Sequence, residues 1–156
     1  SNPAGYRNNE NIDTRGFELE LEKTWHNGLK GQISYAIQST RNRNTRTSLA
    51  NSPKQTVKAN LLVPLYARKA FAGIEGHYTS RRKTLAGEHV GGFLVANLTL
   101  LYENVVRGLD ISLTAYNLFD KKYSDPGVEG PNPDYRVVDK IEQDGRTLRL
   151  KVTYRF

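Results

Sequence analysis

The sequence predicts an all-β protein, an antiparallel up-and-down meander of about seven strands. Apolar and polar residues alternate in segment after segment, no stretch has the spacing of a convincing helix, and short turns alternate with long polar links. An alternation with a period of two residues places the apolar side chains on one face of a strand and the polar side chains on the other. We therefore expect a sheet that has one apolar and one polar face.

The first two segments form a predicted β-hairpin. The segment TRGFELELEKTW (14–25) sets Phe17, Leu19 and Leu21 against the glutamates between them, and LKGQISYAIQS (29–39) alternates in the same way. The residues HNG between the segments are typical of a tight hairpin turn. Strands one and two are therefore expected to be antiparallel neighbours.

Five further segments alternate in the same manner. They are TVKANLLVPLY (56–66), FAGIEGHYTSR (71–81), FLVANLTLLYE (93–103), LDISLTAYNLF (109–119) and GRTLRLKVTYRF (145–156). Pro64 lacks the backbone donor that an interior strand position needs, so it predicts a bulge or the end of its strand. Each segment is close to the roughly 9 to 11 residues that a tilted strand needs to cross a bilayer.

The bulk composition is polar for a protein of this length. Only 37% of the 156 residues are hydrophobic, and the mean hydropathy is −0.64, which is low for a domain that must fill an interior. No window approaches the roughly 18 consecutive apolar residues of a membrane helix, whereas the alternation of a membrane-spanning strand averages out in such a window. The composition therefore excludes a helical membrane span and permits a β-span.

Charge and cysteine content narrow the function classes. The chain contains no cysteine, which excludes disulfides, thiolate metal ligands and a cysteine nucleophile. The formal net charge of +7 permits nucleic acid or an anionic surface as a partner. The first residues, SNPAGYRNNE, lack the basic and apolar regions of a signal peptide, so we expect a chain that is either not exported or a piece of a longer protein.

The connections predict a membrane barrel. The links HNG, ARK and VVRG are short, whereas the links over 40–55, 82–89 and 124–144 are long and polar. Short turns thus lie on one side of the sheet and long loops on the other, as in outer-membrane barrels. An odd number of strands makes the first and last strands parallel, and bacterial single-chain barrels usually have an even number. We therefore interpret the chain as the C-terminal portion of a larger transmembrane β-barrel.

Two segments near the end of the chain resemble a known family. The stretch LTAYNLFDKKYSDPG (113–127), followed by QDGRTLRLKVTYRF (143–156), resembles the closing two strands of TonB-dependent outer-membrane receptors. Asn117 to Tyr123 and the final Phe156 are the specific parts of this resemblance. The similarity covers nearly the whole chain, from about residue 12 onward.

The resemblance implies a receptor that captures a scarce nutrient, commonly a ferric siderophore, and imports it across the bacterial outer membrane. TonB would deliver the energy through an N-terminal plug. Residues 1–156 would form the C-terminal segment of a barrel of roughly 22 strands, and neither the plug nor a TonB box has a counterpart in this sequence. We therefore expect a structural segment that has no enzyme activity and no cofactor, and that does not transport the nutrient alone.

Aromatic residues stand at the short-turn ends of several expected strands. They are Trp25, Tyr102, Tyr154 and Phe156. Outer-membrane barrels carry an apolar outer band with aromatic girdles at both interfaces, so these residues predict one such girdle in contact with membrane lipid. The family resemblance adds that a C-terminal aromatic residue, preceded by alternating apolar residues, is recognised by the barrel-assembly machinery.

Basic residues gather on the expected long-loop side of the sheet. The candidates for ligand contact are Arg41, Arg43, Arg46, Arg81, Arg82 and Lys83. Their charges could meet the phosphates of lipopolysaccharide or an anionic ferric chelate. The alternative is that these basic loops are simply solvated.

The sequence offers no catalytic or metal-binding constellation. Glu18, Glu20 and Glu22 share one face of a strand, where carboxylates at i and i+2 are about 7 Å apart, but a charged barrel lumen explains them without chemistry. Glu75 and His77 are neighbours on the expected inward face, and the other two histidines lie elsewhere in the sequence. There is no phosphate-binding glycine loop and no nucleophile motif.

Two other readings remain open. One is a portion of another outer-membrane barrel, either a porin or a barrel enzyme, whose own features would lie outside this sequence. The other is a soluble, basic β-sandwich that binds a partner such as nucleic acid. Because the aromatic residues segregate with the aliphatic ones instead of interleaving with Lys and Arg, the sequence disfavours a nucleic-acid partner.

The barrel interpretation makes two structural predictions. One face should carry Leu94, Leu98, Leu109, Ile111, Leu113, Leu148, Leu150 and Val152, and the opposite face should carry Glu18, Glu20, Thr99, Ser112, Thr114, Arg149 and Lys151. Because such a sheet has an exposed apolar face and two open edges, the isolated chain should also associate with other copies of itself.

Overall fold

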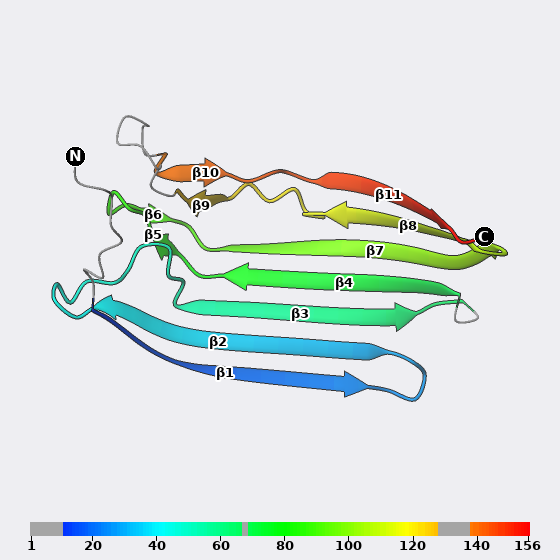
Figure 1. Cartoon of the computed structure of the whole chain (residues 1–156), viewed down its shortest axis with the longest axis horizontal. Coiled ribbons are helices and arrows are strands. Elements are labelled where there is room, and N and C mark those ends of the chain that lie inside the picture. The colour runs from blue at the N-terminus through cyan, green and yellow to red at the C-terminus, as the bar shows by residue number, and fades with distance from the viewer. Residues whose placement is uncertain (1–10, 67–68, 128–137) are drawn as a thin grey trace, which may run out of the picture.

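The computed structural model describes residues 11–66, 69–127 and 138–156. These residues form one seven-stranded sheet and two small two-stranded sheets, and Figure 1 shows the long strands lying side by side. Within the described ranges, no helix is long and apolar enough to cross a membrane. The prediction of an all-β antiparallel meander is confirmed.

The large sheet follows the order of the chain. Its strands are β1 (Ile12–Thr24), β2 (Lys30–Asn42), β3 (Gln55–Pro64), β4 (Ala70–Thr79), β7 (Phe93–Val106), β8 (Leu109–Tyr116) and β11 (Thr147–Tyr154). The small sheets pair β5 (Arg82–Lys83) with β6 (His89–Val90), and β9 (Ser124–Pro126) with β10 (Lys140–Glu142).

All six pairings within the large sheet are antiparallel, so β1 and β11 run in the same direction. Both strands are edges of the sheet. The connections β1–β2, β3–β4 and β7–β8 lie at one end, on the right in Figure 1, which we call the short-turn end. The longer connections lie at the opposite, long-loop end, as the sequence predicted; residues 67–68 of the expected ARK turn and 128–137 of the last link lie outside the described residues.

The strand register carries the alternation across the whole sheet. Leu21 lies opposite Ile33, which lies opposite Ala59, and similar rows continue to β11. The resulting apolar face consists of Phe17, Leu19, Leu21, Ile33, Tyr35, Ile37, Val57, Ala59, Leu61, Val63, Ala72, Ile74, Tyr78, Leu94, Ala96, Leu98, Leu100, Tyr102, Leu109, Ile111, Leu113, Ala115, Leu148, Leu150, Val152 and Tyr154.

The opposite, polar face consists mainly of charged, amide and hydroxyl side chains. They include Glu18, Glu20, Glu22, Gln32, Ser34, Lys58, Asn60, Glu75, His77, Asn97, Thr99, Ser112, Thr114, Arg149 and Lys151. The predicted separation of the two sets of residues onto opposite faces is therefore confirmed.

Strand ends differ from the sequence prediction for local reasons. Strand β8 stops at Tyr116 because Asn117 adopts φ of 47°, outside the β region. Strand β7 extends to Val106 through an irregularity at Asn104, where φ is 50°. Strand β3 ends at Pro64, as expected. The long polar links contain the small hairpins β5–β6 and β9–β10.

The buried hydrophobic residues lie outside the apolar face. Among the described residues these are Val90 and Phe93, and Phe93 lies opposite Thr79 in the rows of the polar face. Both belong to the long-loop end. The apolar face therefore does not serve as a core for the described part of the chain.

Candidate functional site

The apolar face is exposed along all seven long strands. The side chains of Leu94, Leu148 and Leu150 are 62%, 68% and 66% exposed. Soluble monomers rarely expose contiguous apolar patches of more than a few hundred Å². An apolar surface of this extent is suited to contact with lipid or with another protein.

The predicted girdle residues all lie at the short-turn end. The indole of Trp25 covers Gly31, where an added Cβ atom would lie 3.2 Å from the ring, and Lys23 Nζ lies 5.3 Å from the ring centroid. The rings of Tyr154 and Phe156 are 5.8 Å apart, and Phe156 is fully exposed. Tyr102 occupies the row of Ala70 and Ile111 near the same end. The structure thus brings these aromatic residues to one margin of the apolar face.

The β7–β8 turn at this end depends on Asp110 and Gly108. The buried Asp110 carboxylate accepts hydrogen bonds from the backbone N–H of Asn104 (3.0 Å) and from the guanidinium of Arg155 (2.6 Å). Gly108 has φ of 82°, and its carbonyl oxygen accepts a hydrogen bond from the backbone N–H of Arg155 at 2.8 Å. An added Cβ at Gly108 would lie 2.3 Å from the Arg155 carbonyl oxygen. Glycine is therefore required for the last strand to end beside this turn.

A ladder of polar side chains crosses the polar face. Gln32 Nε2 donates to Glu20 Oε1 at 2.7 Å, and Asn60 Nδ2 donates to Gln32 Oε1 at 3.3 Å. Asn97 Nδ2 donates to Glu75 Oε2 at 3.1 Å on the next strands. These hydrogen bonds pair amide and carboxylate groups that the polar face exposes to water. The ladder matches a lumen-facing surface.

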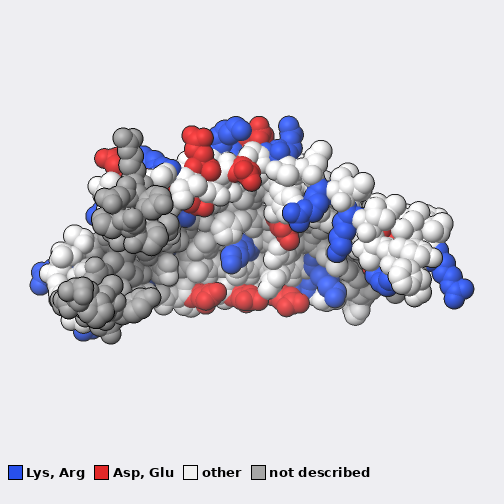
Figure 2. All heavy atoms as spheres, turned by 45° about the horizontal axis from the view of Figure 1, so that its top comes forward, with Lys and Arg blue, Asp and Glu red and all other residues white. Residues whose placement is uncertain are grey.

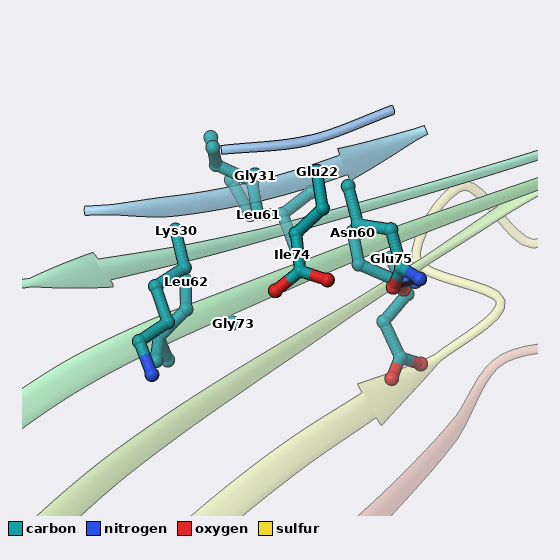
Figure 3. Close-up of a pocket in the computed structure, with 10 residues that line it drawn as sticks. Glu22, Lys30, Gly31, Asn60, Leu61, Leu62, Gly73, Ile74 and Glu75 are labelled. Atoms are coloured by element: carbon teal, nitrogen blue, oxygen red, sulfur yellow. Dashed lines mark hydrogen bonds between the residues drawn. The ribbon is translucent and has the colours of Figure 1, made fainter. Parts of the chain in front are cut away.

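A shallow recess of about 320 Å³ lies on this face. Figure 3 shows Glu22, Asn60 and Glu75 projecting toward it from three strands, with Lys30 at its rim. Acidic side chains also gather along the lower margin in Figure 2, the side on which β1 lies. Within the described residues, none of the glutamates of β1 forms an ion pair, and no group of three or more histidine or acidic residues could hold a metal ion.

The long-loop end contains a buried cluster around Arg82. Its guanidinium forms an ion pair with Asp125 and lies 5.6 Å from the Phe93 ring centroid. The rings of Phe93 and Tyr123 are 4.1 Å apart, and His77 stacks on Phe93 at 6.1 Å. Burial raises the pKa of the Tyr123 phenol. The cluster joins β4, β5, β7 and β9 at this end of the sheet.

The structure separates the basic residues that the sequence grouped together. Arg82 is buried and paired, so its guanidinium is not available to a ligand. Arg41 of β2 lies opposite Asp13 of β1, and the exposed Arg43 and Arg46 follow β2 in the chain. Arg81 and Lys83 instead line a separate cleft.

That cleft includes two residues that the sequence analysis did not select. They are Lys54 and His89, which lie beside Arg81 and Lys83. Lys54 lies in the β2–β3 connection and His89 lies in β6. The two residues are far apart in the sequence, and no local sequence pattern predicts that they line the same cleft. The Arg82–Asp125 ion pair was likewise not predicted from the sequence, since the two residues are 43 positions apart.

The motif around Asn117 fixes the start of the last strand. Asn117 Nδ2 donates to the carbonyl oxygens of Lys121 (2.9 Å) and Asp144 (3.2 Å), and its Oδ1 accepts from Lys121 N at 2.8 Å. Its backbone N–H donates to Asn97 Oδ1 at 3.0 Å. A single buried side chain therefore ties the end of β8 to the segment that leads into β11.

Asp120 provides a second link within the same motif. Its carboxylate accepts a hydrogen bond from the backbone N–H of Arg146 at 2.8 Å, and Lys122 Nζ lies 3.8 Å away. The Arg146 hydrogen bond, and then the charge of Lys122, lower the pKa of Asp120 from its ordinary value. The motif thus acts as a structural clamp between β8 and β11.

Comparison with known proteins identifies the fold. No family model matches the sequence, and no curated protein matches it. Solved structures do match. The ferric-catecholate import receptor Fiu of E. coli K12 aligns with a TM-score of 0.76 and 20% identity over 93% of this chain and 21% of the receptor.

Two further structures give the same result. The siderophore receptor PiuA of Acinetobacter baumannii aligns with a TM-score of 0.74 and 18% identity, over 97% of this chain and 23% of its own. The copper transporter OprC aligns with a TM-score of 0.74 and 20% identity, over 95% of this chain and 25% of its own. The chain thus spans a quarter or less of the length of these proteins.

The fold is that of a segment of an outer-membrane β-barrel. More closely, it is the fold of part of the barrel of TonB-dependent outer-membrane receptors, which the motif around Asn117 had indicated. At 18% to 20% identity, the similarity to these three structures concerns the fold.

Proposed function

We propose that this chain forms the C-terminal segment of the transmembrane barrel of a nutrient receptor in the bacterial outer membrane. The observation that carries the proposal is the continuous exposed apolar face, backed by a polar face and bordered at the short-turn end by aromatic side chains. A lipid-facing wall has this arrangement, with apolar residues outward and polar residues toward the lumen. Seven strands supply only part of such a barrel.

The proposed orientation follows from the two ends of the sheet. The short-turn end faces the periplasm, and the long-loop end faces the outside of the cell. The aromatic residues, Trp25, Tyr102, Tyr154 and Phe156, form the periplasmic girdle, and the last strand carries the signal that the assembly machinery recognises. The alternatives of a porin or barrel enzyme are weaker, because the three structures compared above are two receptors and a transporter.

The nutrient is proposed to be a ferric siderophore. Fiu and PiuA are described as siderophore or ferric-catecholate receptors, whereas OprC is described as a copper transporter. In the complete receptor, TonB supplies the energy for uptake. The present chain acts as a wall of the barrel, performs no enzymatic step and does not transport the nutrient alone.

The single tryptophan provides a direct test of membrane insertion. The full chain is refolded into phosphatidylcholine vesicles that contain lipids brominated at different depths, and Trp25 fluorescence is measured. Bromines near the head groups should quench Trp25 more than bromines at the bilayer centre, because the residue lies at the girdle.

Two variants in a Trp25→Phe background serve as matched controls. Leu98→Trp places an indole on the apolar face, and Thr99→Trp places one on the polar face of the same strand. Bromines at the bilayer centre should quench the first variant several-fold more than the second. Equal quenching of both variants, or a stable detergent-free monomer of 17.6 kDa, would refute the proposal and favour a soluble sandwich.

A further inference from the structure

A cleft of about 530 Å³ opens at the long-loop end of the sheet. Four of its lining residues, Lys54, Arg81, Lys83 and His89, carry nitrogen groups that bind anions. The other lining residues are the hydroxyl-bearing Thr47, Ser48, Ser52 and Ser80, together with Leu49 and Gln55. We call these four residues the basic cleft. No acidic residue is among its lining residues.

The charges of the basic cleft are uncompensated by the described part of the chain. Arg81 and Lys54 are exposed and Lys83 is half-buried, and within residues 11–66, 69–127 and 138–156 none of the three forms an ion pair. Like charges held close together repel each other, so their accumulation favours an anionic ligand that neutralises them. The neighbouring Arg82, by contrast, is already neutralised by Asp125.

The walls of the basic cleft are held in place by the fold. Ser80 N donates to the Gln55 carbonyl oxygen at 3.0 Å, and Gln55 N donates to Ser80 Oγ at 3.0 Å. Asn51 N donates to the Lys83 carbonyl oxygen at 2.9 Å, which joins the β2–β3 connection to β5. The buried Arg82 fixes the same hairpin from behind. The cations are therefore presented on a preorganised frame.

The position of the cleft relative to the apolar face indicates the source of the anion. Val57 and Tyr78 form the last apolar row of β3 and β4, and the next row is the polar pair Gln55 and Ser80, which line the cleft. Ile37 of β2 lies opposite Gln55 and still belongs to the apolar face, so the apolar face ends at this row on β3 and β4 alone. In a membrane-spanning wall, this end of β3 and β4 lies where hydrocarbon gives way to head groups. The cations thus stand at the depth of lipid phosphates.

We propose that the basic cleft binds a phosphate monoester of a lipid head group in the outer leaflet. A phosphate monoester carries close to two negative charges and several strong acceptor oxygens, which three cations and the hydroxyl groups that line the cleft can satisfy. The lipid would then fix the outer end of β3 and β4 against the bilayer. The inference rests on the proposed function for the depth of the cleft, whereas the anion site rests on the cleft alone.

The test measures binding of diphosphoryl lipid A in detergent micelles to the detergent-refolded chain by calorimetry. The triple variant Lys54→Gln, Arg81→Gln, Lys83→Gln should weaken binding by about tenfold or more, because each cation near a phosphate contributes roughly a factor of several to the affinity. The matched control removes the same charge at the short-turn end through Lys23→Gln, Lys69→Gln and Arg107→Gln. It should change the affinity by less than about twofold.

Two further ligands distinguish the sources of the phosphate. Lipid A without its phosphates should bind no better to the original chain than to the triple variant. Inorganic phosphate should compete with diphosphoryl lipid A only weakly, because it lacks the acyl chains that hold the head group at the cleft. Tight binding of inorganic phosphate without preference for lipid A would overturn the lipid source. Equal weakening by the two triple variants would overturn the site itself.

Failure of this inference is distinguishable from failure of the proposed function. Insertion into neutral phosphatidylcholine vesicles, measured with the tryptophan variants above, involves no phosphate monoester. A chain that inserts normally, but whose lipid A binding does not depend on the basic cleft, refutes the cleft alone. A chain that fails to insert, but binds inorganic phosphate through the cleft, refutes the membrane wall and with it the lipid source.

Discussion

At the short-turn end the strands are joined by tight turns whose aromatic side chains stay exposed, whereas at the long-loop end residues from distant parts of the chain pack into a buried cluster. The first end depends mainly on local backbone geometry, as at Gly28 and Gly108, both of which have positive φ, and it also contains the ion pair between Asp110 and Arg155. The second depends on contacts such as Arg82 with Asp125, 43 residues apart.

This difference agrees with the environment proposed for each end. A girdle at a membrane interface gains its stabilisation from lipid and needs short connections, so few side chains need to be buried there. Loops that extend into water lack that support and must stabilise themselves by packing on one another. In the proposed barrel, the exposed apolar face is stabilised by the membrane, whereas the buried cluster is stabilised by contacts within the chain.

Among the changes that test this difference between the two ends, removing the buried Arg82 should have the largest effect on stability. Arg82→Ala leaves Asp125 without its partner and removes the cation above the Phe93 ring. We expect the free energy of unfolding in detergent to fall by about 3 kcal/mol, toward the lower end for a broken buried pair because Asp125 is partly exposed.

Hydrogen exchange followed by mass spectrometry locates this effect. The amides of β5, β6 and β9 should exchange faster in Arg82→Ala, and those of the β1–β2 hairpin should not. Lys83→Ala, one residue further on and half-buried, is the matched control and should change little. Faster exchange at both ends would show that the two ends are not separately stabilised.

Two asparagines with the same backbone conformation allow a sharper comparison. Asn117 and Asn104 have φ of 47° and 50°. Asn117 is buried and makes three side-chain hydrogen bonds, whereas Asn104 is exposed and accepts one long bond from Gly108 N at 3.4 Å. Asn117→Ala should therefore cost about 2 kcal/mol in stability and Asn104→Ala about 0.5 to 1 kcal/mol, mainly from backbone strain.

Urea unfolding in detergent micelles measures both values. Asn117→Ala should also speed hydrogen exchange at the start of β11, since the tie to the Asp144 carbonyl oxygen is lost. Equal costs for the two asparagines would contradict the view that the long-loop end depends on side-chain packing and the short-turn end on backbone geometry.

The sheet was predictable because its signal is local. The alternation of apolar and polar residues in segments such as 14–25 and 145–156 predicts strands. Because successive side chains point to opposite faces of a strand, every second residue lies on the same face. The residues of the short turns then indicate which strand ends are joined by tight hairpins. The direction of each strand, and the end of the sheet at which each connection lies, follow from this without information on long-range contacts. The end of β3 at Pro64 was predicted for the same reason.

The long-loop end was not predictable from such signals. The pairing of Arg82 with Asp125, and the approach of Lys54 to Lys83, depend on how separate loops fold back on the sheet. No periodicity encodes these contacts. As a result, the sequence analysis grouped Arg82 with five other basic residues as candidates for ligand contact. In the structure, Arg82 is buried and has a structural role. Asparagine at Asn117 was visible as part of a motif, but its role as a clamp needed the positions of the acceptors.

The smallest expected effect concerns pH and the Asp120 link of the clamp. The hydrogen bond from Arg146 N and the charge of Lys122 lower the pKa of Asp120, so the folded state favours the charged carboxylate. Its contribution to stability is therefore present above the ordinary pKa of an aspartate and is lost as the pH falls through the lowered value. Asp120→Asn retains an acceptor for Arg146 N but cannot titrate, so it should remove this part of the pH dependence while changing stability little at neutral pH. Exchange rates near Arg146, followed on acidification, provide the measurement. An unchanged acid response in Asp120→Asn would show that other carboxylates, and not this link, govern the acid stability of the long-loop end.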